Sequence, residues 1–129
     1  MLKQYPKEVK LVFKNFPLRS HSLAKPASLA AWAAGQQGKF WEMHDLIFAN
    51  YNKLTQDKFS DFAQQLGLNM EQFNKDLANP KAEALIREDL KNGVEVGVRG
   101  TPTLFVNGRL LKNRSLPGFQ QAIEAELRK

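Results

Sequence analysis

The chain contains no cysteine among its 129 residues. Without a thiol it cannot form a disulfide or present a thiolate nucleophile. Histidine is also scarce, since His21 and His44 are the only two, and the motif His-Glu-x-x-His is absent. The sequence therefore predicts no metal site and no cofactor.

Long apolar runs are also missing. None approaches the roughly 20 residues that a membrane-spanning helix needs, and residues 1–10 lack the apolar segment of a signal peptide. As written, the chain is expected to stay in the cytoplasm with no membrane partner. Its length suits one domain, so we expect a single domain over residues 1–129.

The net charge of +6 raises the alternative of a nucleic-acid binder. Lys and Arg occur in every segment, however, and their densest cluster is Arg109, Lys112 and Arg114. No aromatic RNA-binding motif or zinc-finger spacing accompanies them. We interpret the charge as a solvated basic surface and expect no nucleic-acid partner.

Hydrophobic spacing predicts the order strand, helical block, hairpin, helix. Apolar residues alternate over 9–15, which indicates a mostly buried strand. The pair Asn107-Gly108 favours a type I′ hairpin turn, in which both residues need positive φ. Ser115 can cap a last helix that starts at Pro117. The remaining predicted elements are helices over 22–34, 39–51, 57–66, 69–77 and 81–92, and strands over 103–106 and 109–112.

Several side chains have both a functional and a structural interpretation. His44 falls on the apolar face of its helix and is interpreted as a core histidine, and His21 as a helix cap. Glu42 and Asp45 flank His44 and could assist acid–base chemistry. No serine nucleophile elbow accompanies them, so a solvated face is favoured. A possible ligand box is more simply a contact between two helices; its members are Trp32, Phe40, Trp41, Phe48 and Tyr51.

Three stretches together resemble the DsbA-like branch of the thioredoxin superfamily, a lineage of disulfide oxidoreductases. They are Tyr5-Pro6 with the strand that follows it and His21, Gly38-Lys39-Phe40-Trp41-Glu42-Met43-His44-Asp45, and Gly97-Val98-Arg99-Gly100-Thr101-Pro102-Thr103 with its hairpin. The resemblance implies an α/β, thioredoxin-like (DsbA-type) fold with a helical insertion from about residue 22 to 92.

In that family a strand and a helix opening with Cys-x-x-C precede the Tyr-Pro stretch. The resemblance therefore implies that this fold is amino-terminally incomplete, and Met1-Leu2-Lys3-Gln4 looks like the tail of that helix. The chain would be a natural short product, an internal start or a trimmed chain. Family members are usually periplasmic. Because no thiol is present, we expect no catalytic residue and no redox activity from this chain alone.

The resemblance also implies that the Thr101–Pro102 peptide bond is cis and that the loop binds substrate. The expected substrate-binding residues are Arg99, Gly100, Thr101 and Pro102, whose backbone edge would pair with an extended or unfolded polypeptide. A non-catalytic peptide-binding or assembly module that uses the Thr101-Pro102 edge is therefore the alternative function, and a turn that only connects a helix to a strand is the alternative for the loop.

A further expectation concerns partners. In the family the first strand lies between the counterparts of residues 9–15 and 103–106, so its absence would leave two strand edges facing a gap. Exposed edges recruit other chains. We expect closure by direct pairing of these two segments, by exchange in a homodimer, or by a strand-donating partner, and we favour the homodimer.

Overall fold

The computed structural model describes residues 2–18 and 21–129, which form two compact units. The helical unit comprises Asn15–Gly97, and the hairpin unit comprises residues up to 14 together with 98–129. Each unit is described by itself.

The helical unit contains α1 (Ala24–Gly35), α2 (Phe40–Ala49), α3 (Gln56–Gln65), α4 (Met70–Leu77) and α5 (Pro80–Glu95). These confirm the five predicted helices. The last of them runs three residues further than predicted, because α5 continues through Gly93 to Glu95. None of the described helices is both long and apolar enough to cross a membrane.

Polar side chains start α4 and α5. Asn69 accepts a hydrogen bond from the backbone N–H of Gln72 at 3.0 Å and so caps the first turn of α4. Asn79 accepts from the N–H of Lys81 at 2.9 Å, and Pro80 occupies the first turn, where its missing N–H costs nothing. The Asn-Pro pair is therefore the local signal that begins α5.

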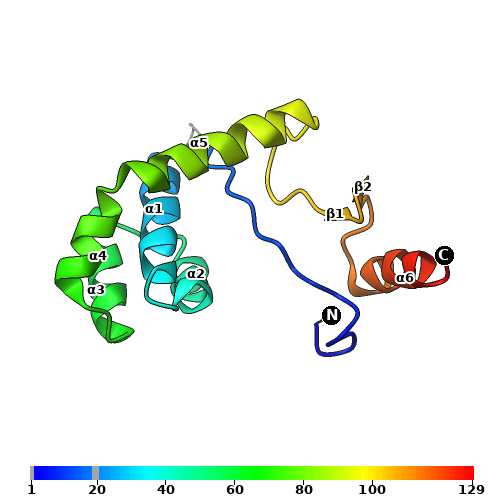
Figure 1. Ribbon diagram of the computed structural model, residues 1–129, viewed down its shortest axis with the longest axis horizontal. Helices are drawn as coiled ribbons and strands as arrows, with labels where there is room; N and C mark the ends of the chain where they lie inside the picture. Colours follow the sequence, from blue (N-terminus) through cyan, green and yellow to red (C-terminus); the bar gives the residue numbers. More distant parts are fainter. Residues whose placement is uncertain (1, 19–20) are drawn as a thin grey trace. The chain divides into compact units, whose positions relative to one another are not determined.

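The core of the helical unit forms around α1. Four alanines of α1 are buried and leave room for other helices to approach: Ala30, Ala31, Ala33 and Ala34. Helix α1 contacts each of α2, α3, α4 and α5. Figure 1 shows α1 between α2 and the pair α3 and α4, with α5 passing over one end of it. The largest fully buried side chains are Phe59, Phe73 and Met43. The unit therefore has a hydrophobic centre of its own.

A buried carboxylate holds the first residue of this unit. Oδ2 of Asp89 accepts hydrogen bonds from both the backbone N–H and the side-chain Nδ2 of Asn15, each at 3.0 Å. Both residues are buried. Because a buried polar group left unpaired is costly, this contact anchors the incoming chain on α5.

The prediction that the aromatic residues join two helices is only partly correct. Trp32 and Phe40 pack against the core, but Trp41, Phe48 and Tyr51 are exposed. Helix α2 is amphipathic and turns Met43 inward, so side chains on its opposite face cannot also reach α1. His44 is half-buried and stacks on Phe48, with ring centroids 4.5 Å apart.

The hairpin unit holds β1 (Phe105–Val106), β2 (Arg109–Leu110) and α6 (Leu116–Leu127). The antiparallel register pairs Phe105 with Leu110, and Asn107 and Gly108 have φ of 48° and 80°, which confirms the predicted turn. Ser115 caps α6 by accepting from the N–H of Gly118 at 3.2 Å. A Cβ at Gly118 would lie 2.2 Å from the backbone oxygen of Asn113, so glycine is required there.

The predicted strand over 9–15 is wrong. Residues 9–14 belong to no sheet, since the described strands form only the ladder of β1 with β2. A strand requires a neighbour to satisfy its backbone groups, and direct pairing with 103–106 is not among the described contacts. Leu11 and Val12 are exposed rather than buried. Residues 2–4, expected as the tail of a helix, form a turn.

Candidate functional site

The loop between α5 and β1 presents the four predicted binding residues. Gly97, with φ of 87°, ends the helix in a conformation that favours glycine. Arg99, Thr101 and Pro102 are exposed, and Gly100 is half-buried. The Thr101–Pro102 peptide bond is cis, the isomer expected from the sequence. The structure thus places all four residues in one short surface segment.

Two side chains from outside this segment hold its backbone. Oγ1 of Thr103 donates to the carbonyl oxygen of Gly100 at 2.6 Å, and Nη1 of Arg114 donates to the carbonyl oxygen of Pro102, also at 2.6 Å. The backbone groups of Arg99 and Thr101 bond no other described residue. The loop is therefore held through the carbonyl oxygens of Gly100 and Pro102, and the backbone groups of Arg99 and Thr101 remain available.

Sequence reasoning did not identify Thr103 or Arg114 as part of the site. Thr103 lies next to Pro102, and a hydroxyl two or three residues from a turn commonly bonds its backbone. Arg114 follows Pro102 by 12 residues and reaches it only because the hairpin folds the chain back. No local signal in the sequence distinguishes it from the other arginines.

The hairpin supports this loop and continues its backbone. Beyond the paired residues of β1 and β2, the N–H of Leu111 donates to the carbonyl oxygen of Leu104 at 2.8 Å. This bond extends the antiparallel pairing to within two residues of Pro102. The other edge of β1 pairs with no described strand, and Thr103 and Leu104 connect the loop to this edge.

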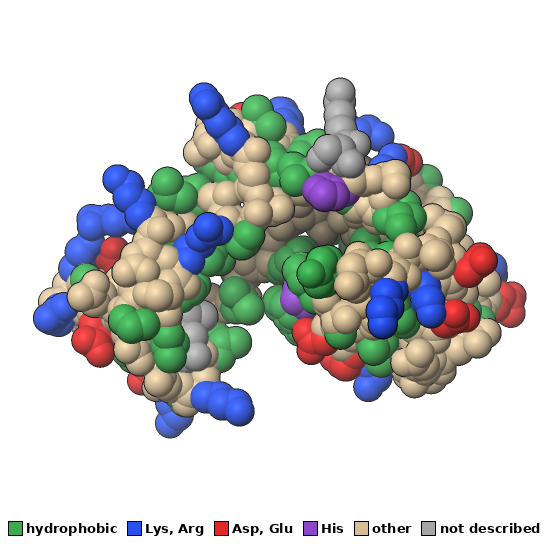
Figure 2. All heavy atoms as spheres, turned by 180° about the vertical axis from the view of Figure 1, so that it is seen from behind, with side chains coloured by type: hydrophobic (Ala, Val, Ile, Leu, Met, Phe, Trp, Pro, Cys, Tyr) green, Lys and Arg blue, Asp and Glu red, His purple; other side chains and the backbone are tan. Residues whose placement is uncertain are grey.

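The charges of the two units differ. The helical unit contains nine Lys and Arg against ten Asp and Glu, whereas the hairpin unit contains ten against three. From Val96 through Ile123 the sequence has four basic residues and no acidic one. The whole positive excess of the chain therefore belongs to the unit that carries the loop. On the face shown in Figure 2, Lys and Arg side chains are spread out and not gathered in one spot.

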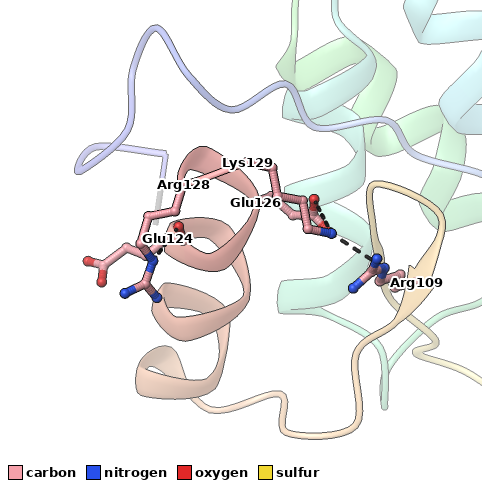
Figure 3. Close-up of polar contacts among 5 residues, drawn as sticks. All are labelled: Arg109, Glu124, Glu126, Arg128 and Lys129. Carbon is pink, nitrogen blue, oxygen red and sulfur yellow. Dashed lines mark hydrogen bonds and ion pairs between the residues drawn. The ribbon is translucent and has the colours of Figure 1, made fainter.

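One carboxylate of the hairpin unit is already neutralised. Glu126 lies between Lys129, at 3.2 Å, and Arg109, at 3.7 Å (Figure 3). The hydrogen bond from Lys129, followed by the charges of Lys129 and Arg109, lowers the pKa of Glu126. By contrast, neither Arg99 nor Arg114 forms an ion pair with a described residue.

The histidines and carboxylates considered from the sequence lie away from this loop in the chain, within the helical unit. Asp45 is exposed beside His44, with Oδ1 3.1 Å from Nδ1, and Glu42 pairs with Lys39 at 3.5 Å. His21 is exposed and lines an open pocket of about 440 Å³ with Lys25, Glu83 and Arg87. Within the described ranges, no three His, Asp or Glu residues come together as a metal site would require.

Comparison with known proteins identifies the family. The family model of the DSBA-like thioredoxin domain matches residues 1–124, so this chain belongs to that family. A thioredoxin-like oxidoreductase from Silicibacter pomeroyi has a similar structure, with a TM-score of 0.74 over 92% of this chain and 69% of that one, at 23% identity. The fold is accordingly an α/β thioredoxin-like fold, dominated here by helices.

Curated relatives share the sequence over a part of their own length. The chain is 40% identical over 102 residues to a Na(+)/H(+) antiporter NhaA 1 of Salinispora arenicola, and 33% identical over 105 residues to a Na(+)/H(+) antiporter NhaA of Herminiimonas arsenicoxydans. The matched stretches make up 78% and 81% of this chain, but only 16% and 17% of the length of the two relatives.

Proposed function

We propose that this DsbA-like domain is a redox-inactive polypeptide-binding module. Two observations support the proposal: the chain has no thiol to attack a disulfide, and the loop at Arg99–Pro102 leaves backbone groups open beside an unpaired strand edge. The antiporter activity named for the relatives is not included, because the chain spans about a sixth of their length.

The proposed binding mode is addition of an extended segment to the edge. An incoming strand gains affinity from main-chain hydrogen bonds, which do not depend on sequence, and specificity from side chains beside the edge. Arg99 and Thr101 supply the open groups. Thr103 and Arg114 keep the loop in place, so less conformational entropy is lost on binding.

Substitution of Gly100 by Leu tests this mode. A Cβ at Gly100 meets no atom within 4 Å, so the fold accommodates a side chain that would obstruct an approaching strand. We expect a fluorescent 12-residue Thr/Val/Gln peptide to bind about tenfold more weakly to the variant, a loss equivalent to one or two hydrogen bonds. Fluorescence anisotropy at constant ionic strength measures it.

The matched control is Ala84→Leu, which places the same leucine side chain at an exposed site of α5 in the helical unit. Peptide affinity should not change there. Equal affinity of Gly100→Leu and the unaltered protein would refute binding at this edge, and absence of peptide binding to the unaltered protein would refute the module itself.

A second copy of the chain is the partner we propose for the extended segment 9–14. Leu11 and Val12 are exposed there, at 44% and 63%, and a β-prone segment without a ladder recruits another strand. We expect light scattering at micromolar concentrations to report a dimer. Val12→Lys should shift it to the monomer, because a charge on an edge opposes pairing.

The control for this experiment is Val94→Lys. Val94 has the same exposure of 63% but lies on α5, so the substitution adds an equal charge to a helix surface. A monomer at all concentrations for the unaltered protein would contradict the homodimer, and a dimer that survives Val12→Lys would place the interface elsewhere.

A further inference from the structure

The proposed polypeptide-binding edge carries an uncompensated positive charge. Its unit has seven more basic than acidic residues, whereas the helical unit has one fewer basic than acidic. An even distribution of charge would balance acidic and basic residues in both units. The scarcity of carboxylates around the loop means that a partner, rather than the domain itself, can neutralise this surface.

Two arginines, Arg99 and Arg114, are available to pair with such a partner. Arg99 belongs to the open segment and pairs with no described carboxylate. Arg114 uses one N–H on the carbonyl oxygen of Pro102, and a guanidinium has five such donors in a planar fork. Arg109, in contrast, already pairs with Glu126. Arg99 and Arg114 are therefore the arginines of residues 98–114 that pair with no described carboxylate.

We propose that the segment bound at this edge is an acidic extended polypeptide. The inference rests on the proposed function and adds the substrate class. Backbone groups of Arg99 and Thr101 would pair with the incoming main chain, while the guanidinium groups of Arg99 and Arg114 would donate hydrogen bonds to its Asp or Glu carboxylates. A carboxylate matches the planar fork of arginine and can bind it through two parallel hydrogen bonds.

The size of the preference follows from the exposure of the site. Exposed charge pairs contribute modestly and are screened by salt. Two such pairs predict that a peptide with two Glu binds about five- to tenfold more tightly than its Gln counterpart at low salt. The advantage should shrink as ionic strength rises, and a Lys counterpart should bind more weakly than both.

The experiment compares three 12-residue Thr/Val peptides that differ only in two central residues, Glu, Gln or Lys, by fluorescence anisotropy on the full chain. Arg99→Gln should reduce the Glu-over-Gln ratio by about threefold. The Arg99 side chain is exposed and forms no hydrogen bond or ion pair with a described residue, so its loss should leave the fold intact. Lys58→Gln, an equal change of charge on the exposed surface of α3, should leave the ratio unchanged.

The outcomes separate the two proposals. Equal binding of the Glu and Gln peptides, both weakened by Gly100→Leu, would keep the polypeptide-binding module and overturn the acidic preference. No binding of any peptide would overturn the module. A single-stranded oligonucleotide that binds more tightly than the Glu peptide, and loses affinity in Arg99→Gln, would overturn the acidic preference in favour of nucleic acid.

Discussion

We expect the purified chain not to accelerate the reduction of insulin disulfides above the background rate set by dithiothreitol. Thiol–disulfide exchange needs a thiolate that attacks one sulfur and forms a mixed disulfide, and this sequence offers no thiol for either step. No other side chain can form that intermediate. Oxidation of a reduced model peptide should likewise proceed no faster than without protein.

The insulin assay must count reduced chains by chromatography rather than by turbidity. A protein that binds extended polypeptides would delay precipitation of the released chains and imitate inhibition. A thioredoxin with an intact Cys-x-x-C pair, at the same concentration, is the positive control. Turnover above the protein-free rate would show that the domain has a redox activity independent of cysteine and would contradict the proposed function.

The second large effect concerns the core of the helical unit. Phe73 on α4 is fully buried, so Phe73→Ala removes most of a side chain from a filled interior and leaves a cavity. Such substitutions lower the free energy of unfolding by about 3–5 kcal/mol, a large fraction of the roughly 5–15 kcal/mol available to an ordinary domain. Urea unfolding followed by circular dichroism measures the loss.

Phe48→Ala is the matched control, because the same atoms are removed from a side chain that is 62% exposed on α2. Its effect should stay within about 0.5 kcal/mol. Phe73→Leu should fall between the two, since it keeps most of the buried volume. A small effect of Phe73→Ala, comparable to the control, would mean that α4 is not part of the cooperative core.

Helices were predictable because their signals are local. Asn69 and Ser115 each bond the backbone within three residues, and the apolar spacing of α3 and α4 identifies the side that turns inward. Residues 9–14 show the limit of this reasoning. Their alternation indicates a strand, but whether a strand forms depends on a neighbour that supplies hydrogen bonds, and alternation cannot reveal that neighbour.

The candidate site divides in the same way. Thr101-Pro102 and the Asn107-Gly108 turn are visible in the sequence, because proline and glycine restrict the backbone wherever they occur. Arg114 is not, because its bond to the carbonyl oxygen of Pro102 exists only after the hairpin returns the chain. The unequal charge of the two units is present in the sequence but acquires meaning only once the unit boundaries are known.

The sequence by itself determined that this chain has no thiol chemistry, that five helices separate an early β-prone segment from a late hairpin, and that its loop resembles that of DsbA-like proteins. Each of these follows from residue type or from spacing within a few residues. Only the tertiary structure decided that segment 9–14 joins no ladder, that Asp89 holds Asn15, and that Arg99 and Arg114 are left with free donors at the loop. These depend on contacts between residues far apart in the chain, which no local pattern encodes.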